Sequence, residues 1–358
     1  MDIYGYNMDM IKTRLLNKIN QLKEDLDKIR PVKGKDLLKL QEGLRIEWIY
    51  NSNAIEGNSL SLGETAFFLR EGLTTEGRPL KDFLEAKNHQ EAILAMNDCL
   101  KNKRSLSQSF IKELHAVLLK NIDYIWVRGK GGRLVRKKIE AGKYKTQPNH
   151  VLTLSGKVHY YTEPIKVQFE MDQLMNWYKN KGQGLEVVER ATIFHYKLVK
   201  IHPFDDGNGR LARILMNLIL IKDGFLPAVI KNDKRREYLK ALESADKGNL
   251  SIFVNFTAFE VMETMEKVLM ALKGEIKMDY IEFEVKPTAK DREKQILKQI
   301  KGGLKYGVAD ILRLVRIKRP TLKKDLARLV RKGRLKRTGK GKGTRYSLRR
   351  LSLQVNEP

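Results

Sequence analysis

Apolar residues recur every three or four positions through most of the chain, a spacing that puts them on one face of an α-helix. The clearest run covers residues 10–30, whose apolar positions are Ile11, Leu15, Ile19, Leu22, Leu26 and Ile29. Similar spacing predicts further helices at 36–50, 63–71, 80–101, 107–120, 164–179, 186–200, 209–222, 233–245 and 250–272. The pattern therefore favours a mainly α fold.

Two stretches depart from this helical pattern. The polar residues 51–61, rich in small side chains, follow the helix predicted at 36–50. Between residues 128 and 163, glycines separate short runs of β-favouring residues. Residues 151–154 and 158–161 are two such runs on either side of a turn at 155–157, which predicts a β-hairpin. We expect a nearly all-helical core with this one hairpin inserted.

Composition excludes several classes of protein. The only cysteine is Cys99, so a disulfide framework and a cysteine-built zinc site are both excluded. The most apolar stretch, residues 211–221, contains Arg213 and Asn217, whereas a membrane-spanning helix needs about 20 largely uncharged residues. Residues 1–9 lack the charged start and apolar centre of a signal peptide. We expect a cytoplasmic protein with no membrane partner.

The charge of the chain is concentrated near its C-terminus. Its formal net charge is +27, from 70 Lys and Arg against 43 Asp and Glu. Residues 286–358 contribute 24 basic and 5 acidic residues, a net of +19. Residues 286–288, Lys-Pro-Thr, are a plausible linker ahead of this segment. Such a basic segment indicates a polyanionic partner.

This basic segment resembles a winged helix-turn-helix domain. Helices are predicted at 290–301 and 307–316, and a third runs to Arg331 with Thr321 as its cap. Residues 333–348 then predict a β-ribbon with a glycine-rich tip. The resemblance implies DNA contacts from the third helix and the ribbon, through Arg319, Lys323, Lys324, Arg328, Lys340, Lys342 and Arg345. RNA contact, a protein-binding role and a merely solvated charged face remain as alternatives.

The most informative stretch is residues 202–210, His-Pro-Phe-Asp-Asp-Gly-Asn-Gly-Arg, with Arg213 one turn further on. A glycine-rich turn entering a helix presents unpaired N–H groups and the positive end of the helix dipole to an anion. Arg210 and Arg213 can reach one face of that helix and suit a polyphosphate. Asp206 is placed to hold magnesium against phosphate, and His202 to accept a proton from a hydroxyl.

Each part of this stretch also has a plain interpretation. Asp-Asp-Gly-Asn-Gly is ordinary turn chemistry, His-Pro is common at helix ends, and two arginines at helical spacing often mark a solvated surface. The compact combination instead favours in-line phosphoryl or nucleotidyl transfer.

Residues 202–210 and Arg213 match the signature of the Fic family without a gap, and the resemblance extends over roughly residues 36–270. It implies an all-helical Fic core that transfers AMP from ATP to a Tyr, Thr or Ser hydroxyl of a protein. Residues 142–164 resemble the family's flap hairpin, which covers the nucleotide and docks the target. Residues 235–239, with Arg235 and Tyr238, resemble the segment beside the adenine, and Asp246 matches more loosely.

The resemblance assigns roles by position. His202 would deprotonate the target hydroxyl, and Asp206 would bind Mg²⁺ between the α- and β-phosphates. The implied nucleotide-binding residues are Gly207, Asn208, Gly209, Arg210, Arg213, Tyr238 and Asp246. Relatives that phosphorylate carry lysine at the position of Gly209, so this glycine favours AMP transfer.

A second short pattern precedes the core. Residues 52–57, Ser-Asn-Ala-Ile-Glu-Gly, resemble the inhibitory motif of the Fic family. The resemblance makes Ser52 and Glu56 regulatory, with Glu56 reaching Arg213 and obstructing the γ-phosphate. An exposed glutamate near a helix end is the plain alternative. Glu56 could also position a water for removing AMP.

The sequence therefore predicts an adenylyltransferase autoinhibited in cis by Glu56, whose partner is a target protein or the chain itself. The expected domains are a helical region with the inhibitory helix at 1–104, a Fic catalytic core at 105–275 and a winged helix-turn-helix domain at 287–358. The alternative is a nucleic-acid-binding transcriptional regulator whose Fic core senses nucleotides. A homodimer is compatible with either function.

Overall fold

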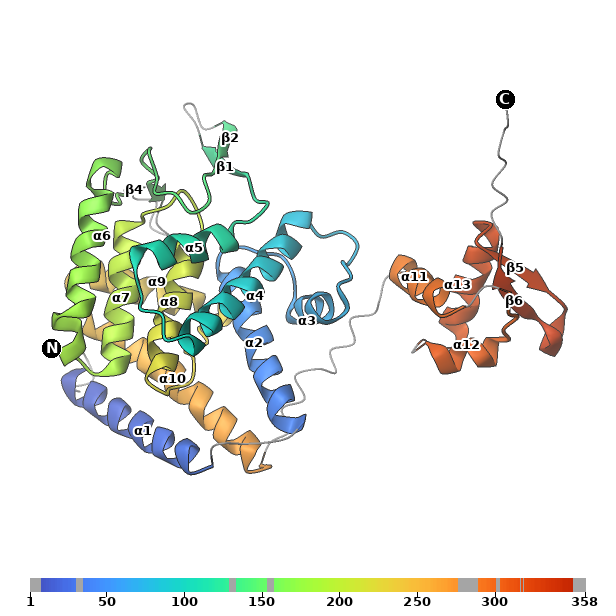
Figure 1. Cartoon of the computed structure of the whole chain (residues 1–358), viewed down its shortest axis with the longest axis horizontal. Helices are drawn as coiled ribbons and strands as arrows, with labels where there is room; N and C mark the ends of the chain where they lie inside the picture. The colour runs from blue at the N-terminus through green and yellow to red at the C-terminus, as the bar shows by residue number, and fades with distance from the viewer. Residues whose placement is uncertain are drawn as a thin grey trace. The chain divides into compact units, whose positions relative to one another are not determined.

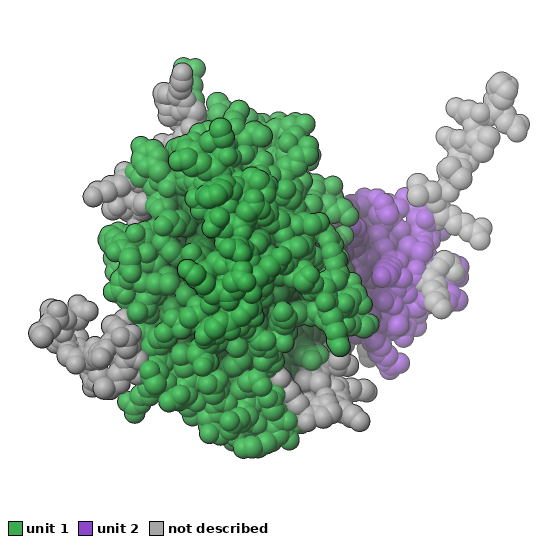
Figure 2. Space-filling view, turned by 60° about the vertical axis from the view of Figure 1, so that its left-hand side comes forward, with its two compact units in different colours: residues 1–71, 78–283 green, residues 72–77, 284–358 purple. Residues whose placement is uncertain are grey.

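The computed structural model describes residues 8–29, 35–128, 133–152, 158–275, 289–300, 303–315, 317 and 319–349. It divides into two compact units, one of residues 1–71 and 78–283 and the other of residues 72–77 and 284–358 (Figure 2). The predicted linker at 286–288 and the predicted hairpin turn at 155–157 lie outside the described residues.

The first unit is helical, as predicted (Figure 1). Its helices are α1 (Met8–Ile29), α2 (Lys35–Ile55), α3 (Leu62–Glu71), α4 (Leu80–Lys101), α5 (Gln108–Leu118), α6 (Pro164–Lys179), α7 (Val187–Ile201), α8 (Asn208–Lys222), α9 (Arg235–Asp246) and α10 (Ser251–Leu272). Short 3-10 turns at Lys181–Gly184 and Asn232–Lys234 connect some of them.

Helix α8 is the centre of this unit. Every residue from Leu211 to Leu220 is buried, because α8 packs against α7, α4, α5 and α2. Removing an aliphatic side chain from water stabilises a fold by about 1.5–3 kcal/mol, so this single helix accounts for a large share of the core. The beginning of α8 is consequently held in place from several sides.

Helix α2 extends further than the sequence pattern indicated. The prediction ended it at residue 50, but it continues to Ile55. Asn51 and Asn53 are buried there, and their side-chain amides donate to the carbonyls of Glu47 and Ile49, at 2.9 and 2.8 Å. Tertiary burial thus overrides the low helix propensity of these polar residues.

The first unit contains two hairpins, so the prediction of a single hairpin was incomplete. Strands β1 (Tyr124–Arg128) and β2 (Leu134–Lys138) pair antiparallel, as do β3 (Val151–Leu152) and β4 (Val158–His159). The β3–β4 pair is the predicted hairpin. The β1–β2 pair was missed because a five-residue apolar run just after a helix cannot be assigned by periodicity alone.

The second unit has its own small core, built by α11 (Ala289–Gln299), α12 (Val308–Leu314), α13 (Arg319–Arg331), β5 (Leu335–Thr338) and β6 (Arg345–Leu348). Strands β5 and β6 pair antiparallel. Thr321 lies inside the first turn of α13, so its predicted capping role was wrong. Pro320 precedes it, and proline suits the first turn of a helix because it lacks an N–H.

None of the helices among the described residues combines the length and apolar character that crossing a membrane requires.

A buried carboxylate organises the second unit. Asp325 on α13 is fully buried and accepts hydrogen bonds from Arg292 on α11, at 2.6 and 3.2 Å, and from Arg328, at 3.0 Å. Arg328 also lies 3.3 Å from Glu293 of α11. These contacts join α11 to α13.

We expect Asp325→Asn to destabilise the second unit by about 1–3 kcal/mol, because a buried neutral amide loses the charge-assisted hydrogen bonds that the carboxylate accepts from Arg292 and Arg328. Hydrogen exchange of peptides from residues 319–331 in the full chain measures this loss. Asp310→Asn is the control, since it changes an acid that only caps α12 through the Gly307 N–H at 2.8 Å. Equal protection in both variants would contradict the role given to Asp325.

Candidate active site

The turn from His202 to Gly207 delivers the chain into the first turn of α8. Gly207 precedes the helix with φ +75°, in the left-handed region that favours glycine. Asn208 is buried, and its amide closes the turn by accepting from the Phe204 N–H, at 3.0 Å, and donating to the Phe204 carbonyl, at 2.8 Å. The first N–H groups of α8 have no intrahelical acceptor, so this turn presents donors to an anion.

His202 ends α7 in a left-handed conformation, with φ 51°. Its Nδ1 lies 3.2 Å from the carbonyl of Val199, which can only accept, so Nε2 bears the lone pair. Burial, together with the charge of Lys145, lowers the pKa of His202 to about 3. The imidazole is therefore neutral at physiological pH and can accept a proton at Nε2.

The predicted flap packs directly on this turn. Tyr161, two residues beyond β4, stacks on the His202 imidazole with ring centroids 3.7 Å apart. Asn149 donates to the Phe204 carbonyl at 2.7 Å, and the Lys145 N–H donates to the Pro203 carbonyl at 2.8 Å. The sequence placed residues 142–164 in the flap but did not single out Tyr161.

His115 of α5 contacts the signature turn, and the sequence pattern did not single it out. Its Nδ1 accepts the Gly142 N–H at 2.8 Å, so Nε2 donates to the Asp206 carbonyl at 3.0 Å. Its ring stacks on Phe204 with centroids 3.7 Å apart. Burial lowers the pKa of His115 to about 4, which keeps this tautomer neutral. One imidazole thus connects the start of the flap to the signature turn.

Arg210 is buried between two acids. Its Nη1 lies 3.1 Å from Glu85 of α4, and its Nη2 lies 3.6 Å from Asp206. Burial would raise the pKa of the Asp206 carboxyl, but the Arg210 charge and the Gly207 N–H outweigh burial and lower it. Asp206 is thus an ionised carboxylate beside the helix start. Glu85 was missed, because nothing in the sequence around α4 marks it.

Arg213 is bound by the end of α2. Its Nε donates to the Ser52 hydroxyl at 2.9 Å, and its Nη2 donates to the Ser52 carbonyl at 2.8 Å and to Glu56 Oε1 at 2.7 Å. The guanidinium is 3% exposed, whereas the Glu56 side chain is 38% exposed. The structure thus brings Arg213 into contact with Ser52 and Glu56, both of which lie far from it in the sequence.

Gly209 lies next to this ion pair. A Cβ at Gly209 would collide with Glu56 Oε1 and lie 3.2 Å from Arg213 Nη1. The glycine therefore has a steric purpose in this state, since it leaves room for the glutamate beside the helix start.

Tyr238 and Asp246 occupy different parts of the site. Tyr238 is buried on α9; its hydroxyl accepts from Arg213 at 3.4 Å and is hydrogen-bonded to His195 Nε2 at 3.0 Å. Asp246, at the end of α9, accepts from the Tyr196 hydroxyl at 3.2 Å and lies 3.7 Å from His159 of β4. Tyr238 is thus joined to the arginine cluster, and Asp246 to the flap.

Several contacts hold the end of α2 against the rest of the unit. Asn51 accepts the Asn232 N–H at 2.8 Å, and the Ile55 carbonyl accepts from Arg235 at 2.7 Å. On the other side, Asn58 donates to Glu85 at 2.9 Å. Glu85 therefore contacts both Arg210 and the segment that follows Glu56.

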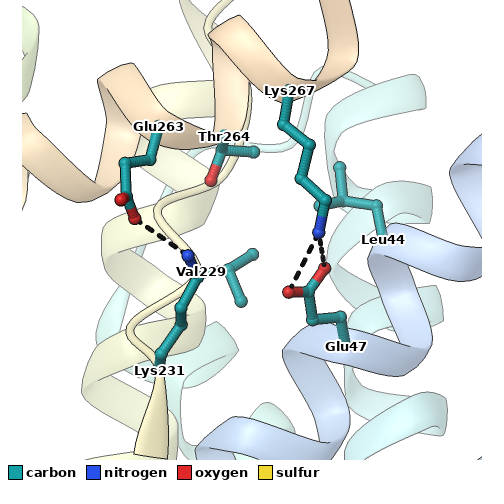
Figure 3. Close-up of a pocket in the computed structure, with 7 residues that line it drawn as sticks. All are labelled: Leu44, Glu47, Val229, Lys231, Glu263, Thr264 and Lys267. Atoms are coloured by element: carbon teal, nitrogen blue, oxygen red, sulfur yellow. Dashed lines mark hydrogen bonds and ion pairs between the residues drawn. The ribbon is translucent and has the colours of Figure 1, made fainter. Parts of the chain in front are cut away.

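A small pocket lies further along α2 (Figure 3). It is bordered by ion pairs between Glu47 and Lys267, at 3.0 Å, and between Lys231 and Glu263, at 2.9 Å. None of the signature residues lines it. The Glu47–Lys267 pair joins α2 to α10, and the Lys231–Glu263 pair joins the segment before α9 to α10.

Comparison with known proteins identifies the family to which this chain is similar. The Fic/DOC family matches residues 105–220. A Fic domain containing signaling protein from Bacteroides thetaiotaomicron has a crystal structure that is 32% identical, covering 72% of this chain and 97% of that chain, with a TM-score of 0.64. The chain belongs to the Fic/DOC family. The signature turn and α8 lie inside the matched segment, whereas Ser52, Glu56, Tyr238 and Asp246 lie outside it.

Two curated Fic relatives are named protein adenylyltransferases. Fic-1 from Caenorhabditis elegans is 29% identical over 74% of this chain and 48% of its own length. The Fic protein from Nematostella vectensis is 30% identical over 72% of this chain and 59% of its own length. The chain thus spans about half the length of these relatives.

Three buried histidines and the partly buried His202 make the stability of the Fic unit depend on pH. Burial lowers the pKa of His89, His115, His195 and His202, in the last three to about 4, 3 and 3. Unfolded histidine titrates near 6.5, so below that pH the unfolded chain binds protons that the native chain excludes. This contribution to stability is complete above about pH 6.5 and falls as the pH approaches 4.

We expect the free energy of unfolding to decrease steeply between about pH 6.5 and pH 4, each histidine contributing about 1.4 kcal/mol per pH unit. Urea unfolding across this range measures the slope. His195→Gln removes one of the four groups. The slope of its free energy of unfolding against pH should therefore be shallower by about 1.4 kcal/mol per pH unit, which corresponds to one proton. An unchanged slope in that variant would contradict this origin of the pH dependence.

Proposed function

We propose that this chain is a protein adenylyltransferase that transfers AMP from ATP to a Tyr, Thr or Ser hydroxyl of a target protein or of the chain itself. The observation that carries the proposal is the start of α8, where a neutral His202 and the paired guanidiniums of Arg210 and Arg213 surround a turn rich in N–H donors. The names of the curated Fic relatives support the same activity.

In this reaction His202 is the general base. The target hydroxyl oxygen attacks the α-phosphorus of ATP while its proton passes to His202 Nε2. The bond from the α-phosphorus to the bridging oxygen breaks, and pyrophosphate leaves with its electron pair. The Nδ1 contact with the Val199 carbonyl favours the tautomer that this step requires.

The remaining signature residues bind the phosphates. The N–H groups of Gly207, Asn208, Gly209 and Arg210 form the anion site. The Asn208 side chain is bonded to Phe204, so it contributes mainly by holding the turn. Arg210 and Arg213 bind the outer phosphates. Tyr238 and Asp246 are assigned to the adenosine side, in a catalytic core at 105–275.

Asp206 suits a magnesium ion. Its carboxylate is ionised and 31% exposed at the start of α8, and Mg²⁺ is commonly held by one or two carboxylates together with phosphate oxygens. Such an ion, when bound, neutralises phosphate charge. No cluster of three metal-binding side chains occurs among the described residues.

Glu56 inhibits the enzyme in this proposal. Its carboxylate occupies the Arg213 guanidinium that would otherwise bind phosphate, and it adds negative charge where phosphate would lie. Ser52 holds the same guanidinium, so residues 1–104 form the regulatory region. The exposed part of Glu56 could also orient a water molecule that removes AMP from the target. Removal of AMP is thus a second role proposed for the same residue.

We expect Glu56→Gly to raise labelling with radioactive ATP and magnesium by about tenfold or more, because it frees a charge-assisted clamp. His202→Ala in the same background should lose about 10²–10⁴-fold. Glu71→Gly, at the exposed end of α3, is the matched control and should stay at the wild-type level. Chelation of magnesium should abolish the labelling.

Mass spectrometry of the labelled band must show an AMP adduct. Equal labelling by the Glu56→Gly variant with and without His202→Ala would refute the assignment of the base. Loss of nucleotide binding in Glu56→Gly would refute the inhibitory role.

We infer that the predicted winged helix-turn-helix domain, residues 287–358, contacts DNA. Arg319, Lys323, Lys324 and Arg331 are exposed along α13, as are Lys340 and Arg345 of the hairpin. Arg328 differs from the expected pattern, because Glu293 and Asp325 bind it within the unit. The order of three helices and a hairpin is that of a winged helix, which supports placing α13 in a groove.

We expect Lys323→Ala with Lys324→Ala to weaken binding of a duplex oligonucleotide. The slope of the logarithm of the binding constant against the logarithm of the salt concentration should become shallower by about two, since each phosphate contact contributes about one. Lys294→Ala with Lys298→Ala, exposed on α11, is the control with the same loss of charge. Fluorescence anisotropy over a salt series measures both. Identical slopes for the two pairs would refute a contact through α13.

A further inference from the structure

The β1–β2 hairpin has two different faces. Its register pairs Tyr124 with Lys138, Trp126 with Arg136 and Arg128 with Leu134, so these residues share one face. The opposite face carries Ile125 and Val127 with their partners Lys137 and Val135. Figure 1 shows the hairpin extending away from the helices of its unit.

The face with Ile125 and Lys137 is joined to the body of the unit. Ile125 packs against a small core made by Leu119, Ile122 and Ile139. Lys137 forms an ion pair with Asp205 at 2.7 Å, and Asp205 immediately precedes Asp206 in the signature turn. The hairpin is therefore anchored next to the candidate active site.

The other face, which we call the outer face, has aromatic and basic side chains in solvent. Trp126 is 67% exposed, Leu134 64% and Tyr124 46%, and Arg136 and Lys138 are exposed beside them. The Arg136 guanidinium lies 4.1 Å from the centre of the Tyr124 ring. Exposed apolar side chains gathered on one surface commonly mark a site of interaction.

The charge of the hairpin has a single sign. Residues 124–138 contain no Asp or Glu, and their basic residues are Arg128, Lys130, Arg133, Arg136, Lys137 and Lys138. Lys137 is paired with Asp205, whereas Arg136 and Lys138 point their charge to the outer face. A partner that complements this surface is acidic and carries apolar side chains.

The backbone offers a second means of recognition. Among the described residues, β1 and β2 pair only with each other, so each strand has one edge without a neighbouring strand. An extended segment can add to such an edge through main-chain hydrogen bonds, while its alternate side chains lie on one face.

We propose that the outer face of the β1–β2 hairpin binds an extended acidic segment of the target protein whose every second residue, on the face toward the hairpin, is either a carboxylate or an apolar residue. The carboxylates pair with Arg136 and Lys138, and the apolar residues cover Trp126 and Leu134. The inference rests on the proposed adenylyltransferase function, because it gives the hairpin the task of holding the target beside the signature turn.

A protein segment fits this surface better than a nucleic acid does. Trp126 and Tyr124 could stack on bases, but Leu134 beside them offers neither stacking nor phosphate contacts. Aliphatic and acidic residues at every second position of an extended segment match Leu134, Arg136 and Lys138, which are likewise two positions apart on one face. The anchor to Asp205 also places the surface beside a site proposed to modify a protein hydroxyl.

The test measures binding of a fluorescein-labelled peptide that repeats Glu-Ser-Leu-Ser, so that glutamate and leucine share one face of an extended segment, using fluorescence anisotropy and the full chain. We expect Trp126→Ser, and Arg136→Glu with Lys138→Glu, each to weaken binding by about tenfold or more. Lys101→Glu with Lys179→Glu makes the same change of charge at exposed positions on other helices. That control, and Lys323→Ala with Lys324→Ala in the second unit, should bind like the wild type.

Equal binding by hairpin and control variants, or no binding by the wild type, would overturn the proposal. So would tighter binding of single-stranded DNA or of phosphatidylserine vesicles that the hairpin variants abolish, since the occupant would then be a nucleic acid or a lipid surface.

Self-labelling of the same variants in the Glu56→Gly background separates this inference from the proposed function. Normal self-labelling with unchanged peptide binding refutes only the docking face. Hairpin-dependent peptide binding without any AMP transfer refutes only the proposed reaction.

Discussion

Two arginines buried at the start of α8 impose a constraint on the whole Fic unit. A guanidinium cannot be removed from water without partners, because an unpaired buried charge costs several kcal/mol. Arg210 finds them in Glu85 and Asp206, and Arg213 finds them in Ser52, Glu56 and Tyr238. Helices α2, α4 and α9 therefore all contact the start of α8. The same requirement explains why a phosphate could replace the Glu56 carboxylate there.

Two neutral histidines, His202 and His115, make further hydrogen bonds in and beside the signature turn. His202 and His115 each use one ring nitrogen on a backbone group, which determines where the remaining proton or lone pair lies. Burial keeps both rings uncharged. The flap closes over this arrangement through Tyr161, which stacks on His202. His202, the signature turn and Tyr161 are thus parts of one packed assembly.

Much of this molecule could be predicted from local patterns. Periodicity located α4 and α6 at their observed ends, and the signature residues 202–210 lie on the predicted turn between two helices. The predicted partnership of Glu56 with Arg213 is also present in the structure, as an ion pair of 2.7 Å. Errors arose where distant residues decide local structure. Asn51 and Asn53 continue α2 because they are buried, and β1–β2 forms because its inner face has a core to pack on.

By itself the sequence determined the helical class, the site of the signature turn and the separation of a basic C-terminal segment, because each depends on neighbours within a few positions. Only the tertiary structure decided that Glu85 binds Arg210, that His115 supports the turn and that Tyr161 covers His202. It also decided which face of the β1–β2 hairpin is exposed. These are contacts between segments far apart along the chain, and burial, which sets both the partners and the charge states, exists only after the helices have packed.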